Sequence, residues 1–459
     1  MSTKLPLRVK MAYGAGDIGF SASYTVISVF LLFYLSDVVK INPGWVGSAL
    51  LVAKLWDAFI DPLIGNISDK TDTKWGRRRP YFLYFAIPFG ISFFLIWSVP
   101  LLVETSMLAT LLLIIIVYIL HITFYSVIAV PYSSLSAELT DDYDERTSIA
   151  AWRMVFSIIA GLVAAVVPKM IVDLFSVQIK GYAVMGAVFG LAIIFSPLFV
   201  FFGCRENNTV KGEKTFSFIE SIKLTLSNKP FILAITMCLL TWLAIEVVSM
   251  VLMFYMKYVL DMEAHSEIIL GIIFIVAAVF LPFWVWFAKK AGKKGAYFAG
   301  MIVFILPLLI ISFLSQGSPA VIYILSAVAG IGLSAAHVIP YSIIPDCIEY
   351  DEMKTGEKRA GAYFGMESFL RQFSSSLGAF ITGQVLEWSG YIADMPQPRS
   401  ALIALRALLG VVPGLIIISA IVVLSFYRIG KRQHEAIKKA VARGKRYRDS
   451  NAGSTVLSQ

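Results

Sequence analysis

Two aspartates in one apolar stretch are the residues of this sequence whose types and spacing point most clearly to a chemical function. Asp57 and Asp61 lie in KLWDAFIDPLIG (residues 54–65), inside an apolar run from about residue 43 to about residue 66. That run is long enough to cross a bilayer as a helix. The four-residue spacing places both carboxylates on one helical face. Because adjacent like charges away from water must share a proton or collect a cation, the pair predicts a cation or proton site.

One alternative needs no bound cation. Asp61 precedes Pro62 and could cap a kinked helix end, with Asp57 reaching water. We favour the cation site, because a charged group in the middle of a span costs roughly 2.5–3.5 kcal/mol on insertion scales and usually serves a function.

Other ionisable residues in the first half of the chain are candidates for binding a substrate. Asp17 follows closely spaced glycines in YGAGDIG (residues 13–19), and Arg153 lies near the start of a later apolar segment. A buried arginine needs a carboxylate, a phosphate or a sugar hydroxyl. If these positions are close to the interface, Asp17 is a helix N-terminal acid and Arg153 snorkels to water.

The second half carries its own intramembrane polar residues. Glu246 and Glu367 are isolated acids, and Arg371 and Gln372 follow Glu367 by one helical turn. Glu367 and Arg371 either neutralise each other as an i, i+4 pair or line a cavity opposite the two aspartates, which we favour. His337 is a candidate for ligand or proton binding, although a histidine satisfied within the core is the commoner case.

A basic loop between two spans is a candidate latch. The loop contains Asp69 and then Arg77, Arg78 and Arg79. These residues could bridge carboxylates at neighbouring helix ends and hold two halves of the protein together, or could simply fix the topology. We assign Asp346, in an acidic run of the second half, to the same latch.

The composition indicates an all-α membrane protein with many spans. Of 459 residues, 58% are hydrophobic and 15% charged, against about 25% charged in soluble domains. Three scattered cysteines and four dispersed histidines predict neither a disulfide framework nor a zinc site. The sequence has no GxxxxGK[ST] motif and no legible nucleophile–His–Asp arrangement, and no cleavable signal peptide is expected. We therefore expect a transport protein without a cofactor and not an enzyme.

Twelve spans are predicted from the apolar runs. Their approximate ranges are 11–37, 43–67, 80–101, 106–135, 148–173, 181–203, 230–258, 266–288, 296–315, 319–344, 361–388 and 401–428. Lysine and arginine gather in the loops on one side, which places both termini in the cytoplasm. The net charge of +9 is therefore a topology signal and does not indicate nucleic-acid binding.

The chain divides into two six-helix halves. Residues 1–203 and 230–428 form the halves, 204–229 a central cytoplasmic loop with a surface helix near 216–226, and 429–459 a basic cytoplasmic tail. An internal repeat supports the division: VPYS (residues 130–133) closes span four, and IPYS (residues 339–342) closes span ten. Repeated halves are typical of rocking transporters with a central cavity.

Five motifs in order resemble one family. YGAGD, WDAFIDP, WGRRRP, VPYSSLSAELTDDYDERT and IIPDCIEYDEMKTGEKRAGAYFG are similar to the glycoside–pentoside–hexuronide:cation symporters, the melibiose-permease-like branch of the major facilitator superfamily. The resemblance spans the whole chain. It implies alternating access driven by sodium or protons, with the coupling ion at Asp57 and Asp61 and with Tyr125 and Ser126 beside it. It further implies that Arg153 helps to form the substrate cavity and that Arg371 matches the basic residue of span eleven in the family.

Departures from that pattern leave the class of substrate undecided. Ser21 and Ala129 stand where melibiose permease has sugar-binding acids, and Ile60 replaces an amide near the cation pair. Our expectation is import of a sugar, a glycoside or a related polar solute. The alternative is an amphiphile such as a lysophospholipid, which vertebrate symporters of this branch carry, and a third interpretation is a non-transporting receptor. We expect a monomer in a bacterial inner membrane.

Overall fold

The computed structural model describes residues 5–103, 106–140, 143–206, 223, 225–314, 319–355, 359–431 and 433–441. Within these ranges the chain is helical and forms no strand. The first group of helices comprises α1 (Leu7–Val26), η1 (Ile27–Leu31), η2 (Tyr34–Val38), α2 (Pro43–Lys70), α3 (Arg79–Tyr84), α4 (Ala86–Leu102), α5 (Met107–Leu139), α6 (Tyr143–Asp173) and α7 (Gln178–Gly203). The second group comprises α9 (Lys229–Tyr258), η3 (Glu263–His265), α10 (Ser266–Phe313), α11 (Pro319–Thr355), α12 (Ala360–Trp388), α13 (Arg399–Arg406), η4 (Ala407–Val411) and α14 (Val412–Ser425).

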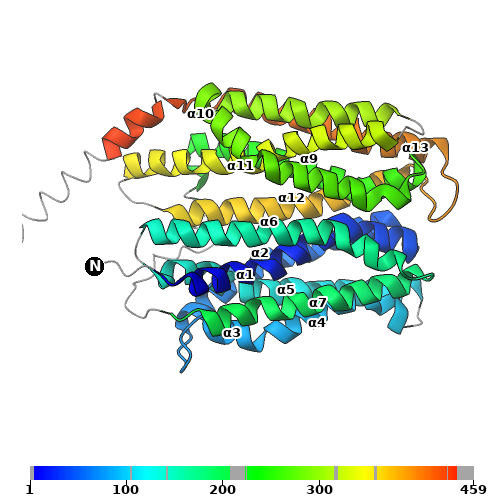
Figure 1. Ribbon diagram of the computed structural model, residues 1–459, viewed down its shortest axis with the longest axis horizontal. Coiled ribbons are helices and arrows are strands. Elements are labelled where there is room, and N and C mark those ends of the chain that lie inside the picture. The colour runs from blue at the N-terminus through cyan, green and yellow to red at the C-terminus, as the bar shows by residue number, and fades with distance from the viewer. Residues whose placement is uncertain are drawn as a thin grey trace, which may run out of the picture.

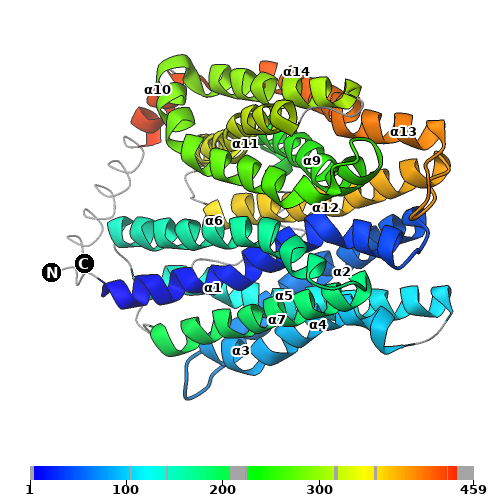
Figure 2. The ribbon, with the colours of Figure 1, turned by 45° about the vertical axis from the view of Figure 1, so that its right-hand side comes forward.

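The two groups lie side by side, and the helices of both run roughly along the long dimension of the molecule (Figures 1 and 2). Three helix pairs form most of the boundary between them: α2 packs on α12, α6 on α10, and η1 on α9. The residues that line a central cavity must therefore come from helices at this boundary.

The positions of the helices follow the apolar runs of the sequence. One helical run, α10, covers two of the predicted spans, and Gly292 interrupts it with φ 79° and ψ 159°. This backbone region is open essentially to glycine alone. Figure 2 shows that α10 turns back sharply along its length. Residues 433–441 of the basic tail are helical, whereas most of the predicted surface helix at 216–226 lies outside the described residues.

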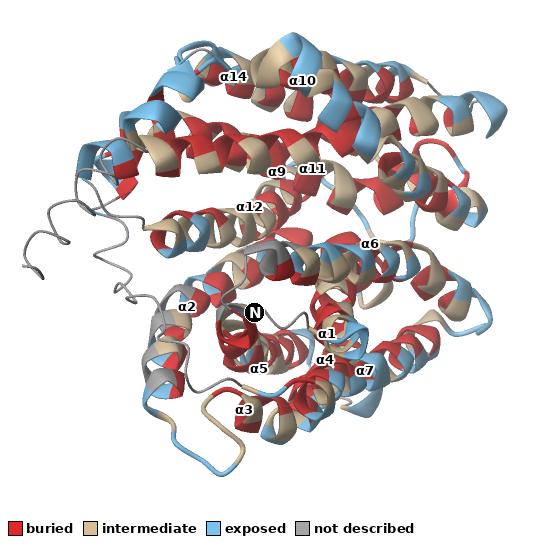
Figure 3. Cartoon of the chain, turned by 60° about the vertical axis from the view of Figure 1, so that its left-hand side comes forward, coloured by how far each residue is buried: buried red, intermediate tan, exposed pale blue. Residues whose placement is uncertain are grey.

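Seven helices of the described chain are long and apolar enough to cross a membrane. Neither α2 nor α12 belongs to this set, because charged and polar residues interrupt their apolar character. Large apolar side chains cover the outer faces, and Leu191, Phe199, Ile310 and Ile418 are all at least half exposed. Seen from the end that carries the N-terminus, exposed residues lie outward and buried ones inward (Figure 3). The protein is thus built for an apolar surrounding.

The repeated proline elements do not end their helices, which corrects the sequence prediction. Pro131 lies inside α5, which continues to Leu139, and Pro340 lies inside α11, which continues to Thr355. A proline removes one backbone hydrogen bond, and packing against neighbouring helices makes that loss tolerable. Tyr132 instead joins two helices: its hydroxyl donates to the Tyr13 carbonyl (2.7 Å), and the Tyr13 hydroxyl donates to the Tyr132 carbonyl (3.1 Å).

Polar contacts hold the two groups together at the end opposite the N-terminus. The buried carboxylate of Asp37 accepts hydrogen bonds from Lys257 Nζ (2.6 Å) and from the hydroxyls of Tyr258 and Tyr391. Burial and the Asp37 charge raise the pKa of Tyr391, so its hydroxyl remains a donor. Further contacts between the groups join Asn42 to Glu387 (2.9 Å), Gly44 and Ser48 to Gln384 (3.0 Å each), and Lys169 to Glu263 (3.4 Å). The structure is therefore closed at this end.

Candidate cation and substrate site

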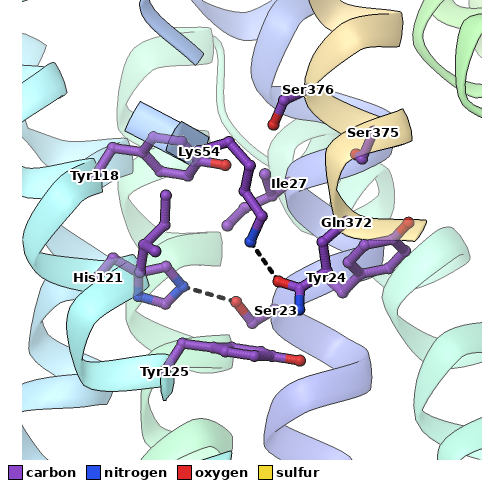
Figure 4. Close-up of a pocket in the computed structure, with 11 residues that line it drawn as sticks. Ser23, Tyr24, Ile27, Lys54, Tyr118, His121, Tyr125, Gln372, Ser375 and Ser376 are labelled. Carbon is purple, nitrogen blue, oxygen red and sulfur yellow. Dashed lines mark hydrogen bonds between the residues drawn. The ribbon is translucent and has the colours of Figure 1, made fainter. Parts of the chain in front are cut away.

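A small cavity of about 60 Å³ lies at the boundary between the two groups (Figure 4). Its walls come from α1, η1, α2 and α5 of the first group and from α12 of the second. They are formed by Ser23, Tyr24, Ile27, Lys54, Tyr118, His121, Ile122, Tyr125, Gln372, Ser375 and Ser376. A void of this size holds only a few water molecules. The cavity is thus a contracted central space, walled by polar groups from both halves of the chain.

Asp57 lies in α2 directly behind this cavity and is buried, with 2% of its surface exposed. Its Oδ1 atom accepts a hydrogen bond from Ser126 Oγ of α5 (2.7 Å), and its Oδ2 atom accepts one from Lys54 Nζ. Both carboxylate oxygens are therefore satisfied inside the protein. Asp57 does not face lipid, as a cation site requires.

The ammonium group of Lys54 is the positive partner of Asp57. It is buried beside the carboxylate and also donates to Gln372 Oε1 of α12 (Figure 4). One lysine thus joins the aspartate of the first group to an amide of the second. Sequence reasoning missed this role, although Lys54 precedes Asp57 by three residues and so lies on the same helical face.

Asp61 lies one turn further along α2 and is half-buried. It interacts electrostatically with Asp57 and Lys54, and it has the Ser126 hydroxyl as a neighbour. The cation-site residues predicted from the sequence are thus brought together. Carboxylate, hydroxyl and amide oxygens are the ligands that hard cations prefer, so Asp57, Asp61, Ser126 and Gln372 suit sodium in their chemistry. No cluster of three or more His, Cys, Asp or Glu side chains suited to a transition metal occurs in the described part of the chain.

A hydrogen-bonded histidine forms another wall of the cavity. Ser92 donates to the Phe89 carbonyl (2.8 Å), so its oxygen accepts from His121 Nδ1 (3.0 Å). His121 Nε2 then accepts from Ser23 Oγ (2.8 Å). This arrangement fixes a neutral imidazole with its proton on Nδ1. No local pattern of residues predicts it, because Ser23, Ser92 and His121 come from three different helices.

The predicted substrate residues of the first group form a charged pair. Arg153 Nε donates to Asp17 Oδ1 (2.6 Å), and Ser21 Oγ donates to Asp17 Oδ2 (2.9 Å). The Arg153 guanidinium also lies over the Tyr132 ring, 5.1 Å from its centroid. Asp17 is therefore buried with a partner and is not a solvated helix end. Tyr125, the other predicted residue of this group, lines the cavity.

The predicted residues of the second group separate into two environments. Gln372 points to Lys54, whereas the Arg371 guanidinium lies over the rings of Tyr24 (5.2 Å) and Trp242 (5.7 Å). Glu367 is buried next to Tyr341, and among the described side chains it forms no ion pair with Arg371. Gln372, rather than Arg371, thus occupies the position of span eleven that faces the cation pair.

His337 packs edge-to-face on Trp242, with the two ring centroids 5.1 Å apart. Its Nδ1 atom bonds the Leu333 carbonyl of its own helix (2.9 Å), which matches the alternative of a satisfied core histidine.

The predicted latch residues of the basic loop contact the first group. Arg77 and Arg78 each lie 3.2 Å from Glu138 of α5, and Arg79 Nη2 donates to the Phe201 carbonyl (2.7 Å). The Glu206 carboxylate also accepts the backbone N–H groups of all three arginines, at 2.6–2.9 Å. The side chain of Asp69 lies outside the described part. These contacts brace the first group and do not by themselves join the halves.

Asp346 makes the corresponding contacts in the second group. Its carboxylate pairs with Lys293 Nζ of α10 (2.6 Å) and with His434 Nε2 of the tail helix (3.2 Å). His434 also lies 2.8 Å from Glu349, and Ile437 packs into the apolar core. Residues 433–441 of the basic tail are thus docked on the second group at the end that carries the N-terminus.

With this geometry established, comparison with known proteins gives the family. The sequence profile of the family "MFS/sugar transport protein" matches residues 12–431. The chain belongs to this family. Its members are transporters, so this protein is a multi-pass membrane transport protein and not an enzyme.

Three relatives and one solved structure are similar to this chain over most of its length. The uncharacterized symporter YjmB of Bacillus subtilis is 30% identical, covering 95% of both chains. The isoprimeverose transporter of Lactiplantibacillus pentosus is 27% identical, covering 93% of this chain and 90% of its own. Sodium-dependent lysophosphatidylcholine symporter 1-A of Danio rerio is 26% identical, covering 93% and 86%. The crystal structure of the nucleoside transporter NupG superposes with a TM-score of 0.64 over 92% of this chain and 99% of its own, at 14% identity, and so shares the fold.

Proposed function

We propose that this protein is a cation-coupled symporter that imports a sugar, a glycoside or a related polar solute by alternating access. The observation that carries the proposal is a buried carboxylate, Asp57, whose positive partner is a lysine side chain and whose site adjoins a cavity walled by both groups of helices. A lysine ammonium can be displaced by a free cation of the same charge. The relatives named as symporters agree with this mechanism.

The contacts of Lys54 suggest how the cation is coupled to the substrate. A sodium ion or proton that binds at the aspartate pair replaces the Lys54 ammonium as the positive partner of Asp57 and so releases it. The release also breaks the Lys54–Gln372 hydrogen bond between α2 and α12. The cation thereby changes the contact between the halves, and the substrate, which binds between them, must change cation affinity by the same factor.

The proposed substrate space lies between the aspartate pair of the cation site and the polar residues on the other walls of the cavity. Tyr125, Gln372 and the Asp17–Arg153 pair offer hydroxyl, amide and charged groups that suit a polyhydroxylated ligand. At about 60 Å³ the cavity is too small for a sugar, so the halves must move apart to admit one. In this cycle the Asp37 cluster closes one end, and the arginine loop with Asp346 belongs to the gate at the other end.

The wider arrangement is part of the proposal. Residues 1–203 and 230–428 act as two six-helix bundles with twelve spans, and both termini and the basic tail lie in the cytoplasm. The protein works without a cofactor, as a monomer, and in a bacterial plasma membrane. Nucleic acid is not a partner.

Import of a lysophospholipid or a similar amphiphile is the second candidate. The observation that favours it is the likeness to the lysophosphatidylcholine symporter over nearly the whole chain. Ser21 and Ala129, where melibiose permease has sugar-binding acids, also fit a substrate with few hydroxyls.

Counterflow in proteoliposomes tests the proposal. Proteoliposomes that contain the purified protein are loaded with unlabelled isoprimeverose, melibiose or lysophosphatidylcholine. Entry of the labelled compound is then measured in sodium, in choline instead of sodium, and after a pH step. We expect exchange of a sugar, stimulated by sodium or by acid pH. Exchange of the lipid alone would support the second candidate, and binding without exchange would indicate a receptor.

A further inference from the structure

A second buried carboxylate adjoins the cavity on the side of the second group. Glu246, in α9, is 2% exposed and accepts three hydrogen bonds from hydroxyl groups. The donors are Tyr24, Ser28 Oγ (2.5 Å) and Ser375 Oγ (3.0 Å). No lysine or arginine nitrogen among the described side chains lies within ion-pair distance of it. The environment of Glu246 is therefore a shell of hydroxyls around a carboxylate, which is the chemistry by which a carboxylate binds a sugar.

The three donors belong to different parts of the molecule. Tyr24 and Ser28 lie on α1 and η1 of the first group, whereas Ser375 lies on α12, beside α9 in the second. The contact between α9 and α12 is close, since a Cβ atom at Gly378 would lie 3.1 Å from the Glu246 Cβ. Ser375 therefore moves together with Glu246 when the halves move apart, whereas Tyr24 and Ser28 move with the first group.

The cavity wall connects these groups to the space for the substrate. Tyr24 and Ser375 both line the cavity, as Figure 4 shows, so Glu246 lies directly behind them. Admission of a sugar requires α1 and η1 to move away from α9 and α12. That motion removes two of the three donors from Glu246, and a buried carboxylate that loses its donors without replacement is strongly destabilised.

We propose that Glu246 is the acceptor for two hydroxyl groups of the substrate, and that Tyr24 and Ser28 supply substitute hydroxyls when the carrier is empty. The inference rests on the proposed sugar symport and adds a binding residue outside the cation pair. It accounts for the hydrogen bonds of both closed forms: substrate hydroxyls satisfy the carboxylate in the loaded carrier, and Tyr24 and Ser28 satisfy it in the empty one. The empty carrier can then close and return, as net uptake requires.

The first test removes the charge of Glu246. The full chain, Glu246→Gln and the control Glu387→Gln are reconstituted, and sugar half-saturation is measured by counterflow of isoprimeverose and melibiose. Glu387 is a suitable control, because it also joins the two groups by a hydrogen bond, to Asn42, but does not line the cavity. Loss of hydrogen bonds to a charged acceptor should weaken sugar binding roughly tenfold or more in Glu246→Gln and leave the control near the unsubstituted value. Both variants should still unfold cooperatively on heating, which would show that both fold.

The second test addresses the substitute hydroxyls. Ser28→Ala should lower net uptake, which needs return of the empty carrier, more strongly than exchange, which does not. Equal loss of the two rates would overturn the role of Ser28. Sugar half-saturation in Glu246→Gln within about twofold of the unsubstituted chain would overturn the role of Glu246. Failure of sugar symport itself is distinguishable, since the unsubstituted chain would then exchange neither sugar, and that outcome would overturn this inference as well.

Discussion

Replacing Lys54 by glutamine should make the protein bind sodium more tightly. Lys54 and Asp57 form a buried ion pair, with 10% and 3% of their side chains exposed. Removing one partner of a buried pair costs about 3–5 kcal/mol, because the remaining charge is left without compensation. Under the proposed mechanism, with sodium as the coupling ion, sodium must displace the ammonium in the unsubstituted chain and so loses part of this energy. In Lys54→Gln the carboxylate is uncompensated from the start.

The size of the effect follows from that cost. If only about 1.4 kcal/mol of the pair energy opposes sodium in the unsubstituted chain, its removal strengthens sodium binding by about tenfold. We therefore expect the sodium concentration for half-maximal stabilisation to fall by at least about tenfold, together with lower stability in the absence of sodium. Sugar uptake should lose its cation dependence, because the contact between Lys54 and Gln372 is also lost.

The assay is thermal unfolding of the purified protein in detergent over a range of sodium chloride, with choline chloride keeping the ionic strength constant. Lys169→Gln is the matched control, because Lys169 is also a buried lysine paired with an aspartate of its own helix, Asp173, but does not line the cavity. The control should lose stability without a change in sodium half-saturation. An unchanged or weaker sodium response in Lys54→Gln would refute the idea that the lysine competes with the cation.

Three further predictions concern the site, the closed end and the fold. Ser126→Ala removes a 2.7 Å hydrogen bond to Asp57 and one candidate ligand, so sodium half-saturation in the same titration should rise roughly tenfold; no change would exclude Ser126 from the site. Asp37→Asn removes the charge that holds Lys257 and two tyrosine hydroxyls, so spin labels at Leu174 and Ile392 should report longer distances across the closed end, and an unchanged distribution would contradict that role. Gly292→Ala places a side chain at φ 79° and ψ 159°, which should lower the free energy of unfolding by about 1–3 kcal/mol with sodium half-saturation unchanged; an unaltered unfolding temperature would show that the turn relaxes freely.

Much of the fold can be predicted from the sequence, since apolar runs of bilayer length and the spacing of polar loops place most helices to within a few residues. Helix ends are less predictable. Pro131 and Pro340 look like terminators, but each removes only one hydrogen bond, and tertiary packing carries both helices past them. The break at Gly292 is equally hidden, because its need for glycine comes from a backbone conformation and not from a pattern of residue types.

The candidate site divides in the same way. Asp57 and Asp61 are evident because one helix supplies both at a fixed spacing, and Lys54 could have been found from that spacing as well. Glu246 is visible as an isolated acid, but its donors are contributed by α1, η1 and α12, and no local spacing predicts such partners. The choice between Arg371 and Gln372 also depends on the rotation of α12 about its axis, which packing sets and local sequence does not.

Counterflow by the Asp57→Asn variant, measured with and without the cation, is the decisive experiment on ion coupling. The substitution keeps the shape of the side chain but removes the charge that a mobile cation must neutralise. We predict that sodium or an acid pH no longer stimulates sugar exchange and no longer stabilises the protein against heat. Cation-dependent uptake at the unsubstituted level in this variant would show that Asp57 does not hold the coupling ion.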